Sequence, residues 1–386
     1  MQARAWVLGV LVVVGSCASC DEAKSPETNV AAVVTWNVGL AEGYVSYAPQ
    51  RRPEILAAIP KLDADVVCLQ EVWSQADASA VIAAAASVFP ESYQVQLEDD
   101  TVGPPGCPPE SEQVAALSVC ATSKCGTLPS SELGGCVLGQ CKQEFDAVPP
   151  SCVECLAANL GQALDTILLS CTTGSARYFA KGANGLVLLS KHPLQNRTHL
   201  AMTSTNTQRS VLGATVNLPG LGETDVYCTH IAADLESQLK YNGPYASWGA
   251  ENLAQLDAIF AQIAATKRTD QILLLGDFNA GPAIPPQIAA ELPDNYKHTI
   301  DAGWRDWPGT GADALCTFCP ENTLISDTAS GVLIDHIYGK GIPAAFSESR
   351  AARIETDTVT IETPDGPAQS HRSDHFGMRL QFDRSR

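Results

Sequence analysis

Residues 273–280 join an apolar run to a polar end, in the order Leu-Leu-Leu-Gly-Asp-Phe-Asn-Ala. Because side chains alternate along an extended backbone, Asp277 and Asn279 would project from one side while Phe278 turns toward the core. A carboxylate beside a carboxamide suits chemistry on a phosphate, since one group can take a proton from water and the other can hold an oxygen. The same residue types are common in turns, so this run alone leaves a strand-end turn as an equal alternative.

Other polar groups stand beside apolar runs elsewhere in the chain. They are Asn37 after residues 30–34, Glu71 after residues 65–69, His230 after residues 225–228, Asp335 within residues 332–338, and Asp374 with His375 before residues 376–382. Polar side chains placed repeatedly at strand ends are what an active site at a sheet edge requires. An unpaired charge inside an apolar strand would be costly, so Asp335 is expected to have a cationic or hydrogen-bonding partner.

The ordered set resembles the endonuclease/exonuclease/phosphatase superfamily, which includes deoxyribonucleases, abasic endonucleases, inositol polyphosphate phosphatases and neutral sphingomyelinases. The motifs that carry the resemblance are Thr35-Trp36-Asn37, Gln70-Glu71, Thr229-His230, Gly276-Asp277-Phe278-Asn279, Ile334-Asp335-His336 and Ser373-Asp374-His375. The resemblance implies an α/β fold, a four-layer α/β/β/α sandwich of two packed mixed sheets with outer helices. It assigns residues 30–384 to one catalytic domain.

Hydrolysis of a phosphate ester needs an activated water and charge relief on the phosphate and the leaving oxygen. A hard divalent cation held by carboxylate and carboxamide oxygens can supply the charge relief, which favours Mg²⁺, or Mn²⁺ or Ca²⁺. Glu71 and Asn37 are expected ligands, and the resemblance adds Asp374. It also implies that Asp277 orients or deprotonates water, that Asn279 and His230 contact phosphate, and that Asp335 orients the acid–base residue His375. His336, beside Asp335, should point to the opposite side of the strand and pack.

The elements that must position these groups can be read from periodicity. Strands are expected at residues 30–37, 65–70, 185–190, 211–217, 224–229, 271–275, 332–338 and 376–382. Helices are expected near residues 53–59, with Pro53 in the first turn, and at residues 77–88 and 248–267. Many strands with few helices agree with two packed sheets covered on the outside.

Residues 103–172 read as a disulfide-rich insertion in this domain. Cysteines stand at 107, 120, 125, 136, 141, 152, 155 and 171, and a spacing of four and then ten intervening residues occurs twice, which allows a duplicated unit. Residues 155–170 have helical periodicity. Four disulfides are favoured over a zinc cluster because no histidine accompanies the cysteines, although their pairing stays open. Cys316 and Cys319 are expected to form a local disulfide, whereas Cys68 and Cys228 are interpreted as small core residues.

The sequence of the N-terminus predicts that the protein is exported from the cytoplasm. Arg4, an apolar run to Val14 and a small-residue site before Cys17 form an export signal over residues 1–16, and residues 17–29 form a polar tether. A lipid on Cys17 would attach the protein to a membrane at the bacterial cell envelope; plain secretion is the alternative. Fourteen cysteines fit an oxidising compartment.

Charge narrows the choice of partner. The net charge of −19 argues against a broad basic surface, so no stable nucleic-acid complex is expected. We therefore expect a divalent-metal-dependent phosphodiester hydrolase that acts on a nucleic acid or on a phospholipid headgroup such as that of sphingomyelin. Aromatic residues within 241–248 could contact a bilayer or pack beneath the following helix. The alternative is a non-catalytic, surface-anchored binding module.

Overall fold

The computed structural model describes residues 30–97, 103–286, 288–307, 316–325, 330–346, 349–364 and 366–383. The export signal, the tether and the lipidation site predicted within residues 1–29 therefore lie outside the described residues. No helix in the described ranges is both long and apolar enough to span a bilayer.

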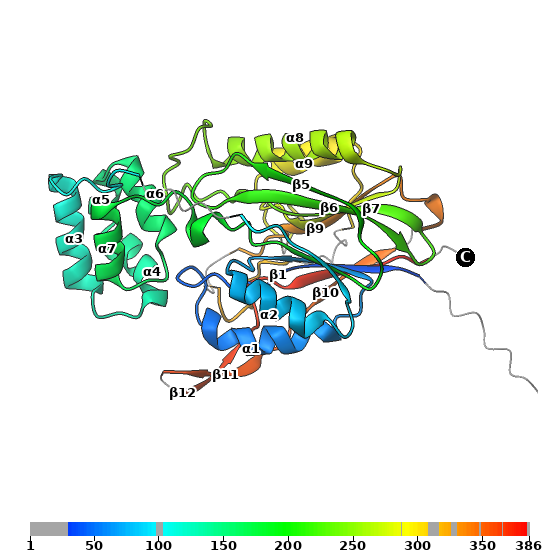
Figure 1. The fold of residues 1–386 in the computed structure, drawn as a ribbon, viewed down its shortest axis with the longest axis horizontal. Coiled ribbons are helices and arrows are strands. Elements are labelled where there is room, and N and C mark those ends of the chain that lie inside the picture. The colour runs from blue at the N-terminus through cyan, green and yellow to red at the C-terminus, as the bar shows by residue number, and fades with distance from the viewer. Residues whose placement is uncertain are drawn as a thin grey trace, which may run out of the picture.

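Two mixed sheets form the middle of the molecule (Figure 1). The first has the order β10-β13-β1-β2-β4-β3 and the second the order β5-β6-β7-β8-β9. The strands of the first sheet are β1 (Ala32–Asn37), β2 (Val66–Gln70), β3 (Glu91–Tyr93), β4 (Val187–Ser190), β10 (Arg350–Ile354) and β13 (Gly377–Gln381). Those of the second are β5 (Gln195–Met202), β6 (Arg209–Leu218), β7 (Gly222–His230), β8 (Ile272–Asp277) and β9 (Asp335–Lys340). Only β1 with β2 and β7 with β8 pair in parallel within these sheets.

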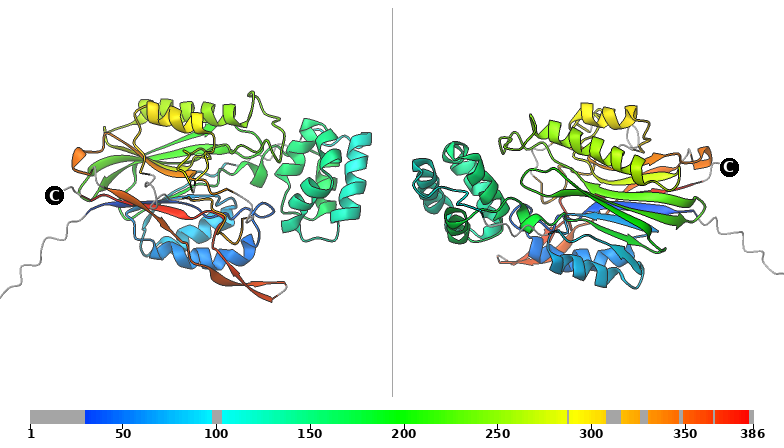
Figure 2. Two further views of the ribbon diagram at one scale, coloured as in Figure 1. Left: turned by 180° about the vertical axis from the view of Figure 1, so that it is seen from behind. Right: turned by 45° about the horizontal axis from the view of Figure 1, so that its top comes forward.

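Helices cover the outer faces of both sheets, as Figures 1 and 2 show. Helices α1 (Ala48–Ala58) and α2 (Gln75–Ala85) pack on the first sheet through a buried cluster that includes Trp36, Ile55 and Val81. Helix α8 (Trp248–Thr266) packs on the second sheet through Leu256, Ile259 and Ile263, and α9 (Pro293–Asp301) lies beside α8. The expected four-layer α/β/β/α sandwich is confirmed.

Every strand expected from the sequence is present to within a few residues, but some elements differ. Helix α1 begins at Ala48, so Pro53 lies inside it and not in its first turn. Pro60 falls in a short 3₁₀ helix, η1 (Ile59–Lys61), which ends that helical segment. Further elements are η2 (Phe179–Gly182), η4 (Ala344–Phe346) and the separate hairpin of β11 (Val359–Thr363) and β12 (Gly366–Ser370).

A disulfide joins the inner faces of the two sheets. Cys68 in β2 and Cys228 in β7 are both fully buried and bonded, although 160 positions separate them in the sequence. Their interpretation as small core residues is correct for their burial but did not foresee the bond. The apolar alternation of each strand correctly placed both side chains inside, but burial alone does not reveal that two cysteines face each other.

Five helices between β3 and β4 form a lobe at one end of the sheets (Figures 1 and 2). They are α3 (Glu112–Cys125), α4 (Ser130–Gln140), α5 (Lys142–Ala147), α6 (Pro150–Ala158) and α7 (Leu164–Thr173). The expected four disulfides join Cys107 to Cys152, Cys120 to Cys141, Cys125 to Cys136 and Cys155 to Cys171.

The disulfide pairing gives the repeated cysteine spacing a different meaning from a duplicated unit. Cys120–Cys141 and Cys125–Cys136 are nested, so they fasten one pair of neighbouring helices, α3 and α4. The helical pattern of residues 155–170 is split between α6 and α7, because residues 159–163 between them form a turn. The lobe has its own core, made of these disulfides and apolar side chains such as Leu117, Phe145 and Ile167.

Candidate active site

The ends of strands from both sheets meet at one edge. Across the second sheet, His230 of β7 pairs with Asp277 of β8, and Asp277 pairs with Asp335 of β9. In the first sheet, Asn37 ends β1 beside the end of β2, after which Glu71 follows. The predicted residues are therefore brought together by register within each sheet and by packing between the sheets.

Asp277 is the centre of the polar cluster and is 1% exposed. Its Oδ2 accepts a 3.0 Å hydrogen bond from Nδ2 of Asn37 and lies 3.4 Å from Nε2 of His230 and 3.8 Å from Nε2 of His375. Its Oδ1 accepts the backbone N–H of Asn279 at 3.0 Å. Burial and the charge of Asp335 raise the pKa of Asp277 to about 7, against the opposing effects of His375 and Asn37. Asp277 can therefore exchange a proton near neutral pH.

His375 and Asp335 form a buried pair. Nδ1 of His375 lies 2.8 Å from Oδ2 of Asp335, which is fully buried, while Oδ1 of Asp335 has no hydrogen-bond partner among the described residues. Burial alone would lower the pKa of His375, but the charges of Asp335, Asp277 and Asp374 raise it well above the ordinary value. The ring is thus held by a carboxylate at one nitrogen and faces Asp277 with the other.

Glu71, Asn37 and Asp374 provide the oxygen donors expected for a divalent cation. Nδ2 of Asn37 donates to Glu71 Oε1 at 3.0 Å, and Oδ1 of Asn37 accepts the Gly39 N–H at 3.0 Å, which fixes the orientation of the amide. Burial and the charge of Asp374 raise the pKa of Glu71, so two carboxylates share this space at an electrostatic cost. Such a donor set fits a hard cation, which would offset that repulsion.

Gly39 allows Asp374 to approach this site. Its φ is +54°, a left-handed conformation, and a Cβ atom there would lie 2.5 Å from Oδ1 of Asp374. Ser373 supports the same segment, because its hydroxyl donates to the Asn37 carbonyl oxygen at 2.7 Å and its Oγ accepts the His375 N–H at 3.2 Å. Backbone contacts thus connect the end of β1 with residues 373–375.

Asn279 and His230 lie on the second-sheet side of the cluster. Asn279 has a φ of +48°, and its Nδ2 donates to the Ile231 carbonyl oxygen at 3.0 Å. Burial, with the charges of Arg209 and His375, lowers the pKa of His230 well below the ordinary value, so this ring is neutral. Nδ1 of His230 is buried without a hydrogen-bond partner among the described residues. It is therefore free to contact a bound group.

Arg209 also belongs to this site. The side chain is 8% exposed, and its guanidinium lies 5.7 Å from the centre of the Trp73 ring. Its Nε and Nη1 are buried with no hydrogen-bond partner in the described part of the chain. Burial lowers the pKa of Arg209, and the charges of Glu71 and Asp277 act against that change. Its position at the start of β6 was the only sequence signal.

Arg51 was missed by the sequence reasoning. It is fully buried in α1 and donates to four backbone carbonyl oxygens, of Ser46, Gly39, Arg372 and Val38, at 2.8, 2.6, 2.5 and 3.5 Å. It thereby fastens the segment after β1 to the segment before Asp374. A signal did exist, because Arg51 shares the helix face of Ala48, Ile55 and Ala58.

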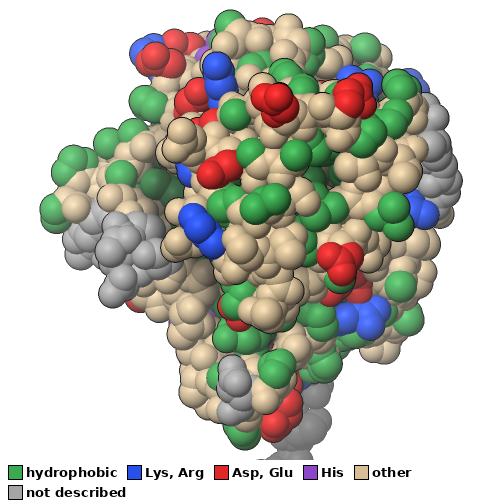
Figure 3. Space-filling model, turned by 90° about the vertical axis from the view of Figure 1, so that its left-hand side faces the viewer, with side chains coloured by type: hydrophobic (Ala, Val, Ile, Leu, Met, Phe, Trp, Pro, Cys, Tyr) green, Lys and Arg blue, Asp and Glu red, His purple; other side chains and the backbone are tan. Residues whose placement is uncertain are grey.

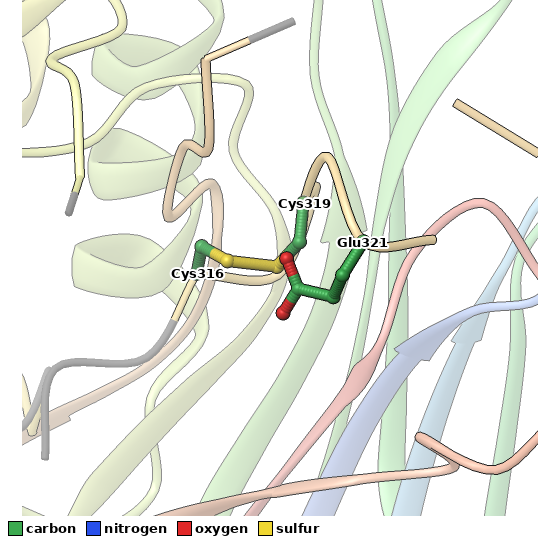
Figure 4. A group of neighbouring side chains, drawn as sticks. All are labelled: Cys316, Cys319 and Glu321. Carbon is green, nitrogen blue, oxygen red and sulfur yellow. A yellow bond between two sulfur atoms is a disulfide. The ribbon is translucent and has the colours of Figure 1, made fainter. Parts of the chain in front are cut away.

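The segment around Cys316 supports His375 and Asp335 from behind. The expected disulfide of Cys316 and Cys319 is present, with the Glu321 carboxylate beside it (Figure 4). Thr317, between them, accepts the backbone N–H of Asp335 through Oγ1 at 3.2 Å, and Phe318 packs edge-on against the His375 ring at 5.2 Å. The cysteines are bonded to each other and so do not act as thiolate metal ligands.

His336 lies away from the cluster, as expected. Its Nδ1 is 2.9 Å from Oδ2 of Asp306, its Nε2 is 3.0 Å from the Ala280 carbonyl oxygen, and its ring stacks on Tyr338. Because a carbonyl and a carboxylate both accept, these contacts suit a doubly protonated ring. His336 therefore supports the segment that carries Asn279.

The family model for the endonuclease/exonuclease/phosphatase family matches residues 34–375. The chain belongs to this family. Its fold and the motif residues gathered at one sheet edge agree with that membership, and the family consists of phosphoester hydrolases. A comparison with curated protein sequences finds no match.

Several solved structures share the fold. SmcL has a TM-score of 0.57 at 13% identity, with 92% of this chain and 99% of that chain covered. Sphingomyelinase C from Streptomyces griseocarneus has a TM-score of 0.55 at 16% identity, with coverage of 92% and 99%. A mutant beta toxin from Staphylococcus aureus with bound magnesium ions has a TM-score of 0.56 at 11% identity, with coverage of 92% and 100%. At these identities the likeness concerns the fold.

Proposed function

We propose that this protein is a divalent-metal-dependent phosphodiesterase that uses an activated water. The observation that carries the proposal is the convergence on Asp277 of Asn37, His230 and His375, with Asp335 behind His375. A buried carboxylate with a pKa of about 7 beside a cationic imidazole provides a proton acceptor and a proton donor in one small volume.

In the proposed reaction, Asp277 takes a proton from the attacking water as the water oxygen bonds to phosphorus. His375, held by Asp335, faces the phosphate with Nε2 and donates a proton to the leaving oxygen as the phosphorus–oxygen bond breaks. Neutral His230 and the amide of Asn279 hold phosphate oxygens. The Arg209 guanidinium, with buried and unused donors, would bind a non-bridging oxygen as its charge grows.

We propose three ligands for the cation: the carboxylates of Glu71 and Asp374 and the side-chain carbonyl oxygen of Asn37. A bound Mg²⁺ would relieve charge on the phosphate and on the leaving oxygen. The ligand atoms of Asp277, Asp335 and His375 also lie within 4.8 Å of one another. We assign that second group to proton transfer, because Asp335 is already hydrogen-bonded to His375 and its position favours an imidazolium there.

A phospholipid headgroup is favoured over a nucleic acid as the substrate. The net charge is −19, and Figure 3 shows Lys, Arg, Asp and Glu side chains scattered over the described surface at the lobe end, without a concentration of Lys and Arg. Nucleic-acid enzymes contact many phosphates with basic side chains. The likeness of fold to sphingomyelinase C supports a lipid substrate by analogy.

The proposed location of the protein, outside the cytoplasm at a membrane, agrees with this substrate. Six disulfides in the described residues fit an oxidising compartment, as expected for an exported protein. A lipid on Cys17, within residues 1–29, would hold the enzyme at a membrane surface.

The test is hydrolysis of a panel of phosphodiesters by the full-length protein, before and after a chelator. The panel is bis(p-nitrophenyl) phosphate, sphingomyelin and plasmid DNA. We expect turnover with Mg²⁺, loss after chelation, and loss in Glu71→Gln and His375→Ala. Glu362→Gln, an exposed change on β11, is the matched control and should retain activity. Absence of turnover on every substrate, with bound metal verified, would sink the proposal.

A further inference from the structure

The lobe and the catalytic sandwich together form an apolar cavity that is open on one side. Its volume is about 280 Å³, and its wall is formed by the lobe helices together with Tyr44 and the segment around Leu235 and Leu239. Apart from Tyr44 and Gln238, the residues of the wall are apolar or are glycines. An apolar wall of this kind is suited to an apolar ligand.

Leucines around the cavity are not fully covered by the protein. Leu138, Leu156, Leu160, Leu164 and Leu168 line it and are only half-buried, although each belongs to the lobe. Leu138, Leu156 and Leu164 pack against the lobe core with one part of the side chain and leave the other part uncovered. Apolar surface left in this state is stabilised when an apolar partner covers it.

The lobe also carries much of the exposed apolar surface. Among the described residues, six large hydrophobic side chains are exposed, and three of these belong to the lobe: Val119 at 71%, Leu169 at 64% and Leu128 at 38%. Tyr44 and Tyr47, at 47% and 40%, lie in the loop after β1 that contacts the lobe. Only Ile300 of this set lies elsewhere. This distribution fits contact with lipid more than with a polar partner.

A row of packed aromatic rings extends from the cavity wall to the phosphate site. Tyr44, in the cavity wall, packs 4.8 Å from Phe179; Phe179 packs 5.5 Å from Trp73; and Trp73 lies 6.2 Å from His230. A ligand with a phosphate and a chain could engage both places.

Direct contacts at Gly43 and Tyr44 join the lobe to the sandwich. The Tyr44 hydroxyl donates to the Ala157 carbonyl oxygen at 2.9 Å. A Cβ atom on Gly43 would lie 2.3 Å from the backbone nitrogen of Gly161, so the two backbones touch. The cavity is therefore a built feature of the joined lobe and sandwich.

We propose that this cavity binds an alkyl chain of a phospholipid substrate whose phosphate lies at Asp277 and His230. The inference rests on the proposed function for the phosphate, and it gives the lobe the task of selecting substrates with a long chain. The chain leaves water for a wall of leucines, which supplies binding energy that a headgroup alone lacks.

Two glycines of α4 provide a matched test. Gly135 lines the cavity, and a Cβ atom there would have no neighbour within 4 Å, so Gly135→Trp would place a large ring into that space. Gly139, one turn later, is equally open but does not line the cavity, which makes Gly139→Trp the control. Both changes replace a helix-interior glycine, so neither should prevent folding.

Binding is measured by calorimetry on the full chain with a chelator present, so that no turnover accompanies it. The probes are monomeric dodecylphosphocholine, phosphocholine and dodecanoate. We expect dodecylphosphocholine to bind more than about tenfold tighter than phosphocholine, and Gly135→Trp to remove that advantage while Gly139→Trp keeps it. Equal binding of dodecylphosphocholine by the wild type and Gly135→Trp would overturn the proposal. Dodecanoate binding as tightly as dodecylphosphocholine would overturn the link to a phosphate-bearing substrate.

The two proposals fail separately. Bis(p-nitrophenyl) phosphate has no alkyl chain, so its Mg²⁺-dependent hydrolysis tests the phosphate site alone. Loss of that activity with chain binding intact would contradict the proposed function. Retained activity without chain-dependent binding would contradict only the role of the cavity.

Discussion

The amide nitrogen of Asn37 lies 3.0 Å from Oδ2 of Asp277, and the two residues come from different sheets. The same nitrogen donates to Glu71 at 3.0 Å. One neutral amide thus holds the expected cation ligand and the expected proton acceptor at a fixed separation, where a third carboxylate would repel both.

Asn37→Asp should therefore lower kcat by about 100-fold, because a charge replaces the donor between two carboxylates. The measurement is Mg²⁺-dependent turnover, with thermal unfolding to verify the fold. Asn217→Asp, an exposed change in β6, is the control and should have no effect. A variant at Asn37 with wild-type kcat would show that the amide does not organise the site.

Asp335→Asn should lower the pKa of His375 toward its ordinary value, because the charge that most strongly raises it is removed. We expect kcat to fall by about 1000-fold. NMR titration of His375 and steady-state kinetics provide the two readouts. The double variant with His375→Ala should be no slower than His375→Ala alone, since the pair acts as a unit; additive losses would contradict the pairing.

Arg209→Gln should lower kcat/KM by about 10- to 100-fold, since a charge-assisted hydrogen bond to the phosphate is lost. Arg209→Lys should recover only part of the loss, because a lysine lacks the guanidinium fork. Arg197, exposed and paired with Glu91, offers the matched control Arg197→Gln. If both glutamine variants behave alike, Arg209 has no role at the phosphate.

Replacing Cys68 and Cys228 by alanine should lower the free energy of unfolding by about 5 kcal/mol, because the bond closes a loop of 160 residues. Cys316 and Cys319 are three positions apart, so the same change there should cost about 1.5 kcal/mol. Urea denaturation of both variants measures the difference. Equal losses would mean that loop closure is not the source of the stability.

The pair of His336 and Asp306 should make stability depend on pH. Burial lowers the pKa of His336, but Asp306 and the Ala280 carbonyl raise that pKa by more than burial lowers it. The pKa of His336 in the folded state therefore lies above its pKa in the unfolded state. The contribution is then complete below the unfolded pKa of about 6.5 and is lost as pH rises through the folded pKa. Asp306→Asn should destabilise more at about pH 5 than at about pH 9. A pH-independent loss in urea denaturation would contradict this account.

Sequence reasoning worked where local pattern decides structure. Alternation in strands and the spacing of Leu256, Ile259 and Ile263 placed the sheets and α8, while polar residues at strand ends pointed to Asn37 and Asp277. It missed β5 because that strand is largely exposed on both faces, so its residues lack an apolar alternation. It also left open whether the aromatic residues after Leu239 contact a bilayer. In the structure Tyr241 packs on Trp248 and donates to Glu251.

The amino-acid sequence by itself determined the fold family, the ordered motif residues and the presence of a disulfide-rich lobe. Tertiary structure decided which distant groups meet: Cys68 with Cys228, Asn37 with Asp277, and Arg209 buried beside Trp73 with unused donors. It also decided that the lobe and the sandwich together form an open apolar cavity. The physical reason is that the pattern of apolar and polar residues indicates which face of a helix or strand is buried. Which residues meet across two sheets depends instead on how the whole layers pack.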